Sequence, residues 1–285
     1  MIKQIFLIIA VSVSLFSCVN SNSNRKKEAG DLRIISLVPS LTKELESLCL
    51  TDNIVGATSY CDIAKNNRDL IVGSAVKVNM EKVILLKPDV VFAGGLTNDS
   101  YLRTLRDEGI KVYKFPNPKS FDGICNDFIQ IGKITGREKK ARELVRKTRQ
   151  RIDSICRQIP DVGKNPKLFF QIGADPIYTV IPNTFMDDYI TLAGCENIAA
   201  DLKSGSISRE TILSRNPDVI FISTMGMVGE NEKRIWESYG VLNAAVNKRI
   251  FIIDSNIACS ATVMSFADAL QQIVSEVWSV PATGN

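Results

Sequence analysis

Short apolar runs alternate with amphipathic stretches along most of the chain. The runs are rich in Val, Ile and Phe, as buried strands are, and the stretches between them have the apolar spacing of helices. In the first half we expect strands at 33–38, 54–57, 89–93 and 111–115, and helices at 42–50, 81–86 and 101–108. Strands that alternate with helices of about ten residues predict βαβ units and a parallel sheet.

The second half repeats this plan. Residues 210–221 match residues 81–92, with the same offset of 129 residues at a Glu, a Pro, an Asp and a Phe. Further strands are expected at 167–172 and 249–254. An equal offset at four positions is hard to obtain by chance, so the pattern predicts two α/β lobes of similar plan.

A long helix is expected between the lobes. Residues 137–158 are mostly Arg, Lys, Glu and Gln, with apolar residues at helical spacing. A helix of this length spans about 33 Å, roughly the width of a lobe. We therefore predict an α/β fold of two Rossmann-like lobes joined by one long rigid helix, with lobes at 32–135 and 161–285 and the inter-lobe helix at 136–160.

The N-terminus has the pattern of an export signal. Lys3 precedes an apolar run at 5–16, which is too short to span a hydrocarbon core of about 30 Å comfortably. The run ends in Leu-Phe-Ser-Cys, which resembles the lipobox of bacterial lipoproteins. We expect a signal peptide at 1–17 and a lipidated Cys18 that begins a polar, flexible tether at 18–31. The alternative is an ordinary signal peptide that contains a cysteine.

Composition excludes much of the familiar enzyme chemistry. The 285 residues include no histidine, so a Ser-His-Asp or Cys-His pair and an imidazole metal ligand are excluded. The formal net charge of +4 is small and scattered, which argues against a nucleic-acid partner. No nucleotide-binding or hydrolase motif occurs. The adjacent carboxylates Asp187 and Asp188 are expected to lie on a solvated helix face.

Six cysteines follow Cys18, and none forms a C-x-x-C pair. Such spacing is neither a zinc framework nor a redox motif. We expect mostly buried, apolar thiols, and leave one disulfide open among Cys49, Cys61, Cys125, Cys156, Cys195 and Cys259.

Candidate ligand-binding residues follow from the topology. In open parallel sheets, ligands bind beyond the carboxyl ends of strands, which here face a crevice between the lobes. The loops at those ends carry Pro39, Ser40, Tyr60, Gly94, Gly95, Asp175, Tyr178 and Asn256. The glycines would let a ligand approach the backbone, and the tyrosines offer flat apolar faces with polar tips. No metal ion or cofactor is expected.

Six sequence blocks occur in the order and at the spacing of a known family. They are RIISLVPS at 33–40, VGATSYCD at 55–62, NMEKVILLKPDVVFA at 79–93, FFQIGADPIYT at 169–179, AGCENI at 193–198 and ISRETILSRNPDVI at 207–220. With them the chain resembles, over nearly all of 32–280, the ABC-importer substrate-binding proteins that have a rigid inter-lobe helix. That group serves vitamin B12, ferric siderophores and haem, and its cobalamin receptors are the most similar.

The resemblance implies a receptor, not an enzyme, that captures a corrinoid between its lobes. The receptor would work as a monomer at the outer face of the cytoplasmic membrane, the periplasm in a two-membrane bacterium, and deliver its ligand to an ABC permease dimer with ATPase subunits. It also implies that Glu81 and Glu210, one on each lobe, engage permease arginines, and that Tyr60 lies against the corrin.

The chain departs from the cobalamin receptors in its cleft aromatics. The stretches 73–77, 201–205 and 255–259, where those receptors carry further rings, contain none here. A hydroxamate-type ferric siderophore receptor or a haem receptor therefore stays as an alternative. Less favoured alternatives are a lipid-anchored α/β enzyme and a structural surface lipoprotein.

Overall fold

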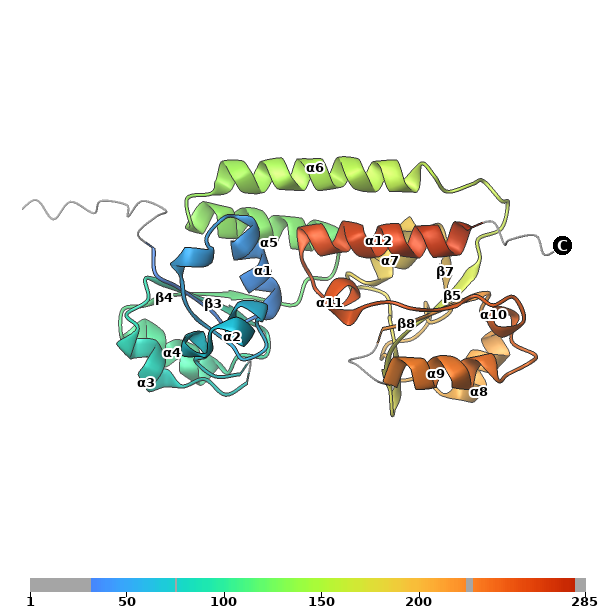
Figure 1. The fold of residues 1–285 in the computed structure, drawn as a ribbon, viewed down its shortest axis with the longest axis horizontal. Coiled ribbons are helices and arrows are strands. Elements are labelled where there is room, and N and C mark those ends of the chain that lie inside the picture. The colour runs from blue at the N-terminus through green and yellow to red at the C-terminus, as the bar shows by residue number, and fades with distance from the viewer. Residues whose placement is uncertain (1–31, 75, 224–227, 280–285) are drawn as a thin grey trace, which may run out of the picture.

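The computed structural model describes residues 32–74, 76–223 and 228–279, which form two α/β lobes side by side beneath a long helix (Figure 1). The segments expected as signal peptide and tether, with Cys18, lie outside the described residues. Within the described ranges, every helix is too short or too polar to cross a membrane.

The N-terminal lobe is built on a parallel four-stranded sheet with the order β2-β1-β3-β4. Its strands are β1 (Ile34–Ser36), β2 (Ile54–Ala57), β3 (Val90–Gly94) and β4 (Lys111–Phe115). Its helices are α1 (Pro39–Ser47), α2 (Asp62–Asn66), α3 (Met80–Leu85), α4 (Asp99–Asp107) and α5 (Phe121–Ile134). The four strands expected in this half are confirmed, and the central β1 is buried along its length because helices cover both faces of the sheet.

The first helix begins at Pro39, three residues earlier than expected. The expectation that Pro39 and Ser40 lie in a loop is wrong. Proline suits the first turn of a helix because the N–H that it lacks has no intrahelical partner there. The Thr42 N–H already donates to the Val38 carbonyl at 3.0 Å. Ser40 thus lies in the first turn, just beyond the carboxyl end of β1.

The C-terminal lobe has a sheet with the order β6-β5-β8-β9, and β7 pairs with β5 beside this path. Its strands are β5 (Lys167–Ala174), β6 (Ile177–Thr179), β7 (Glu196–Asn197), β8 (Val219–Ile222) and β9 (Ile250–Ile252). Its helices are α7 (Asp187–Leu192), α8 (Arg209–Arg215), α9 (Val228–Glu237), α10 (Asn243–Val246), α11 (Ser255–Ala258) and α12 (Val263–Trp278). The sheet is not wholly parallel, because β6 folds back antiparallel on β5 and makes a hairpin where a cleft loop was expected.

The 129-residue repeat extends to individual hydrogen bonds. β1 pairs with β3, and β5 pairs with β8, in the same parallel arrangement. Just before β1, the Arg33 N–H donates to Asp89 Oδ2 at 2.9 Å, and at the first residue of β5 the Lys167 N–H donates to Asp218 Oδ2 at 2.9 Å. The two aspartates hold equivalent strand pairs together, which confirms that the lobes share one plan.

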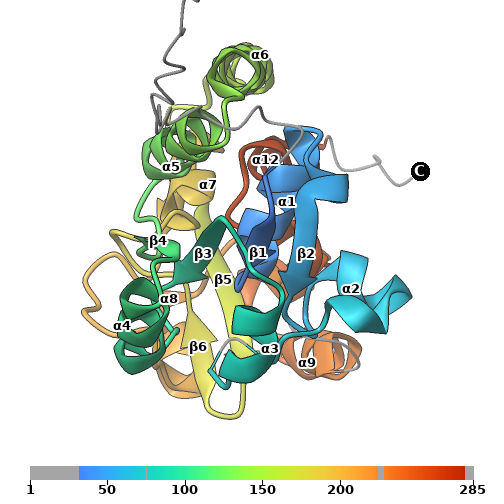
Figure 2. The same cartoon turned by 90° about the vertical axis from the view of Figure 1, so that its left-hand side faces the viewer.

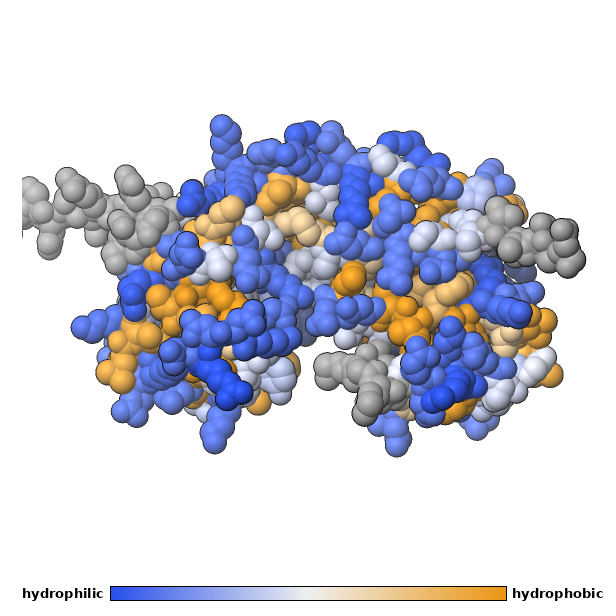
Figure 3. Space-filling model, in the orientation of Figure 1, coloured by the Kyte–Doolittle hydropathy of each residue, from blue (hydrophilic) through white to orange (hydrophobic). Residues whose placement is uncertain are grey.

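One long helix bridges the lobes, and one helix of each lobe lies beneath it. The expected long helix is α6 (Glu138–Cys156), which spans both lobes above α5 and α12 (Figures 1 and 2). Arg149 of α6 contacts Asp122 of α5 at 2.7 Å, and Arg151 contacts Asp268 of α12 at 2.5 Å. On the side away from α6, a hollow parts the two lobes (Figure 3). The connection is therefore a layered spine, in which α5 and α12 reinforce the single helix that the sequence predicts.

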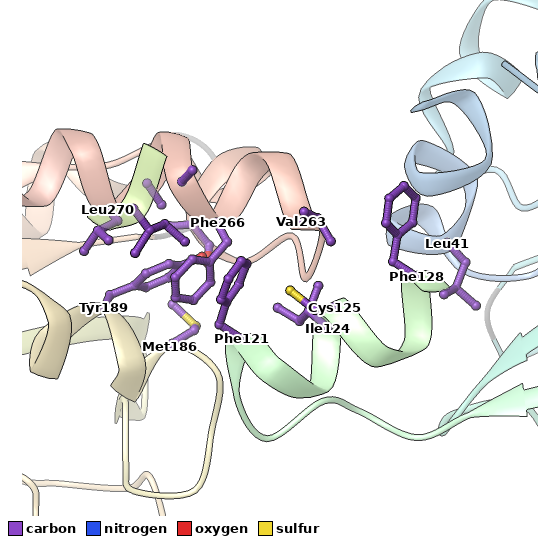
Figure 4. Close-up of a cluster of buried hydrophobic side chains, with 14 of the residues drawn as sticks. Leu41, Phe121, Ile124, Cys125, Phe128, Met186, Tyr189, Val263, Phe266 and Leu270 are labelled. Carbon is purple, nitrogen blue, oxygen red and sulfur yellow. The ribbon is translucent and has the colours of Figure 1, made fainter. Parts of the chain in front are cut away.

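An aromatic junction lies where α5, α7 and α12 meet (Figure 4). Phe121 of α5 stacks on Phe266 of α12 with ring centroids 4.4 Å apart, and Tyr189 of α7 lies 4.5 Å from the same ring. All three side chains are buried in one apolar core that is continuous between the lobes. Because close-packed rings can slide or part only by losing contact area, this junction resists wide opening of the lobes.

Asp187 and Asp188 lie at this junction, so the expectation that they occupy a solvated helix face is wrong. Asp188 is half-buried, and its Oδ2 accepts the Phe121 N–H at 2.7 Å. Burial raises the pKa of Asp188. Asp187 Oδ1 accepts the Asn197 side-chain amide at 2.8 Å. Both carboxylates therefore have structural partners, and that of Asp188 ties the first turn of α5 to the C-terminal lobe.

Candidate functional site

A cavity of about 480 Å³ lies between the lobes. The N-terminal lobe contributes Gly94 and Phe115, the last residues of β3 and β4, and the C-terminal lobe contributes Ile172 and Tyr178 from the β5–β6 hairpin. The volume is within the range of about 300–1,000 Å³ that is usual for small-molecule sites. The cavity thus occupies the place where an α/β fold binds ligands, beyond the carboxyl ends of its strands.

The structure brings together three of the eight candidate ligand-binding residues. Ser40, Gly94 and Tyr178 line the cavity. The other five do not belong to its lining, and their contact with a ligand stays a prediction: Pro39, Tyr60, Gly95, Asp175 and Asn256.

The positions of three of these five have simple physical reasons. Tyr60 follows β2, the edge strand of its sheet, and is 66% exposed. Asp175 lies in the turn of the β5–β6 hairpin. The Asn256 carbonyl accepts the Lys43 ammonium at 3.3 Å, a bond that links the lobes through α1 and α11.

Gly94 is required by packing, and not only by the approach of a ligand. A Cβ atom at this position would lie 2.7 Å from Val38 Cγ2, which is closer than real Cβ contacts allow. A larger residue would therefore force the Val38 side chain, just beyond β1, to move. The interpretation that Gly94 and Gly95 together open the backbone to a ligand is therefore not needed to explain Gly94.

The cavity is largely apolar and contains aromatic rings that sequence reasoning missed. Phe115 and Phe185 join Tyr178 in its lining, together with Leu41, Ile124, Ile172, Val180, Ile181 and Met186. Phe115 ends an expected strand, so the end-of-strand rule that selected Gly94 also reaches it. Phe185 has no comparable signal, because it lies in the loop before α7. The stretches 73–77, 201–205 and 255–259 contain no aromatic residue. The three rings of the cavity come from other parts of the chain and offer stacking area in their place.

Two carboxyl groups lie in this apolar lining, and both are absent from the sequence-based candidates. Glu44 of α1 is 2% exposed, and its Oε1 accepts the Val263 N–H at the start of α12 at 3.0 Å. Its Oε2 is buried and has no hydrogen-bond partner among the described residues. Burial raises the pKa of Glu44 well above its usual value, and the charge of Asp127 on α5 raises it further. Burial also raises the pKa of Asp127, to about 6.

We expect Glu44→Gln to stabilise the protein at alkaline pH. Because the folded state raises the pKa of Glu44, it holds a proton that the unfolded chain releases above about pH 4.3, so wild-type stability falls as pH rises through this window. The variant lacks this loss. Its free energy of unfolding should equal that of the wild type near pH 4 and exceed it by about 1 kcal/mol or more at pH 8.

Urea unfolding at several pH values measures this difference. The control is Glu143→Gln on α6, where Lys147 lowers the pKa of the exposed carboxyl instead. That variant should gain no stability as pH rises. A Glu44→Gln variant that is no more stable than the wild type at pH 8 would contradict the raised pKa of Glu44 in the folded state.

Residues 34–257 match the family described as periplasmic binding protein. The chain belongs to the periplasmic binding protein family. It is 30% identical to an uncharacterised ABC transporter substrate-binding lipoprotein, YvrC, of Bacillus subtilis, over 86% of this chain and 79% of YvrC. A cobalamin-binding protein of Halobacterium salinarum is 32% identical over 66% of this chain, which spans only 53% of that relative. A vitamin B12-binding protein of Photorhabdus laumondii is 28% identical, over 81% of this chain and 82% of the relative.

Solved structures share the whole fold. A possible iron-binding protein of Staphylococcus epidermidis superposes with a TM-score of 0.76 at 29% identity, over 87% of this chain and 98% of that protein. The haem-binding protein HutB of Vibrio cholerae gives 0.77 at 21% identity, over 87% and 99%. The vitamin B12-binding protein BtuF of the same organism gives 0.69 at 24% identity, over 86% and 96%. The expected fold class is confirmed.

This periplasmic binding protein is the substrate-binding component of an ABC transporter. Proteins of this kind bind small ligands and work with permease and ATPase partners, and the family and fold are those of transport proteins, not of enzymes. Glu81 and Glu210 are the exposed second residues of α3 and α8. Both helices lie on the side of the molecule away from α6 (Figure 1). The capping side chains of these helices, Asn79 and Ser208, each accept the backbone N–H three residues on, at 3.0 and 3.2 Å.

The cysteines of this periplasmic binding protein form no disulfide within the described residues. Burial raises the pKa of the Cys125 and Cys195 thiols to about 12, so both stay protonated. Cys61 is also buried, whereas Cys49 and Cys259 are exposed. Across the described ranges, no group of three or more Cys, Asp or Glu side chains is arranged to hold a metal ion.

Proposed function

We propose that the protein captures cobalamin or a related corrinoid in the cavity between its lobes and delivers it to an ABC permease. The apolar, ring-lined cavity at the lobe junction carries this proposal. A corrin presents a broad apolar surface with a rim of amide side chains, and Phe115, Tyr178 and Phe185 offer faces for the former. The relatives that are named for binding cobalamin or vitamin B12 support the same ligand.

Capture requires no covalent step. The spine of α5, α6 and α12 keeps the cavity formed in the absence of ligand, so binding is a matter of contact with a prepared surface. We also propose that lipid on Cys18 anchors the receptor to the outer face of the cytoplasmic membrane, where the polar tether at 18–31 would let a single copy reach the permease. The lipoprotein name of YvrC supports this anchoring.

Calorimetry tests the ligand with the full chain in detergent. We expect cyanocobalamin to bind one-to-one with a Kd below about 1 μM, which corresponds to some −8 kcal/mol. Haemin and a ferric hydroxamate are titrated in parallel. Heat from either of these, with none from cyanocobalamin, would overturn the corrinoid and leave the receptor fold in place. The absence of binding heat with all three ligands would overturn the corrinoid, the haem and the siderophore as candidate ligands.

A haem ligand is the second candidate, because the solved haem-binding protein HutB shares the fold of this chain. Haem has propionate groups, whereas the side groups of a corrinoid are mostly amides. The two ligands therefore differ in the charge that they bring to the cavity.

A further inference from the structure

The charged side chains that line the cavity are all acidic. Glu44 and Asp127 are the acidic side chains of its lining, and no Lys or Arg belongs to that lining among the described residues. The cation close to Glu44 in sequence, Lys43, extends to the Asn256 carbonyl and contacts Asp62 at 3.7 Å, outside the cavity. A ligand that enters the cavity therefore meets two carboxyl groups and no compensating positive charge.

One carboxyl oxygen of Glu44 has no hydrogen-bond partner among the described residues. Its Oε1 has a partner in the Val263 N–H, but its Oε2 is buried at the cavity without one. A buried polar atom without a hydrogen-bond partner destabilises the folded state relative to a bonded one. A leucine or methionine here would avoid that cost while still packing between α1 and α12. The fold alone therefore does not explain this carboxyl, whereas a ligand that supplies the missing partner does.

We propose that Glu44 and Asp127 form an acidic floor that binds a primary amide of the ligand and rejects a carboxylate in the same place. This inference rests on the proposed function, because it names the group by which the corrinoid is recognised. An amide has an N–H donor and a carbonyl acceptor, so it satisfies a carboxyl in either protonation state. A carboxylate offers acceptors alone, and Asp127 opposes its charge.

The acidic floor makes the site selective between macrocycles of similar shape. A corrinoid presents amides around its rim, and these meet Glu44 and Asp127 with matching hydrogen bonds. A haem presents propionates. Glu44 and Asp127 repel these carboxylates in every orientation of the ring that brings a propionate into the cavity. Glu44 and Asp127 are thus specificity-determining residues, and the rings and aliphatic side chains of the cavity supply contact area to either ligand.

The test compares cyanocobalamin with its monocarboxylic acids, in each of which one side-chain amide has been hydrolysed. Calorimetry uses the full chain in detergent at pH 7.5. We expect the wild type to bind cyanocobalamin at least tenfold more tightly than at least one of these acids. In the Glu44→Gln/Asp127→Asn double variant this ratio should fall below threefold, because the acids gain affinity when the negative charge is removed.

The matched control is Glu46→Gln, two residues along the same helix, which does not line the cavity and should keep the wild-type ratio. If the double variant does not fold, the single variant Asp127→Asn replaces it, because this position is only half-buried. It should also lower the ratio of affinities for cyanocobalamin and its acid. Equal affinity of the wild type for cyanocobalamin and all of its acids would overturn the acidic floor. A ratio that survives in the variants would overturn it as well.

The failure of the corrinoid proposal is a separate outcome. If the wild type binds no corrinoid, that proposal falls, and haemin and its diamide become the probe pair. Tenfold tighter binding of the diamide, lost in the double variant, would still support the acidic floor. Equal binding of haemin and the diamide, or binding of neither, would overturn it.

Discussion

Replacing both Glu81 and Glu210 by alanine is expected to abolish stimulation of the permease ATPase while leaving ligand affinity unchanged. The two carboxylates are exposed at equivalent helix starts, one on each lobe, and do not line the cavity. A hydrogen bond to a charged group contributes about 1.5–3 kcal/mol, so loss of both contacts weakens docking by two orders of magnitude or more. ATP hydrolysis in proteoliposomes that contain the permease, with and without the receptor, measures the effect.

The matched control removes one exposed glutamate from each lobe at a position away from α3 and α8. Glu108, which follows α4, and Glu196 of β7 are both exposed. The double alanine variant at these positions should stimulate the ATPase like the wild type. Normal stimulation by the Glu81/Glu210 variant would rule out docking through these two side chains, and reduced ligand affinity would show that they act on the cavity instead.

Glu232→Ala is expected to lower the free energy of unfolding by about 3–5 kcal/mol. Glu232 of α9 is buried, accepts two hydrogen bonds from Arg209 at 2.8 and 2.9 Å, and accepts a third from the Gln171 amide at 2.9 Å. Arg209 also lies over the ring of Trp236, 4.7 Å from the guanidinium, and the Trp236 N–H donates to Gln171 at 2.7 Å. The variant would leave a largely buried cation without its counter-charge, as urea unfolding would detect.

Glu237→Ala on the same helix is the control. Its ion pair with Lys233 spans 3.9 Å between partly exposed side chains, so its loss should cost less than about 0.5 kcal/mol. A Glu232→Ala cost below about 1 kcal/mol would contradict the role of the network. Because Arg209 precedes Glu210 and Gln171 precedes Ile172, this network joins the start of α8 to the wall of the cavity.

The two-lobe plan could be predicted because its determinants are local and repeated. The Pro-Asp pair at 88–89 recurs at 217–218 and immediately precedes the equivalent strand in each lobe. The helix starts that carry Glu81 and Glu210 are likewise fixed by capping residues two positions earlier. Patterns of this kind depend on neighbours in sequence, so reading along the chain is enough to find them.

The acidic floor could not be predicted in this way. On its helix, Glu44 stands between Lys43 and Leu45 and reads as a polar, exposed position. It is buried where the start of α12 meets it, and its hydrogen-bond partner there, Val263, lies 219 residues further along the chain. Asp188 was misread for the same reason, since its partner Phe121 is 67 residues away. Contacts between the lobes leave no periodic signal in either segment.

The aromatic junction under α6 also bears on how the transporter distinguishes a loaded receptor from an empty one. Phe121, Tyr189 and Phe266 pack closely between the lobes, so we expect their relative position to change little when the cavity is filled. Small-angle scattering should therefore give one radius of gyration for both forms. A partner that meets a receptor of constant outline has no closed shape to sense. Selection of the loaded form must then depend on touching the cargo itself at the mouth of the cavity.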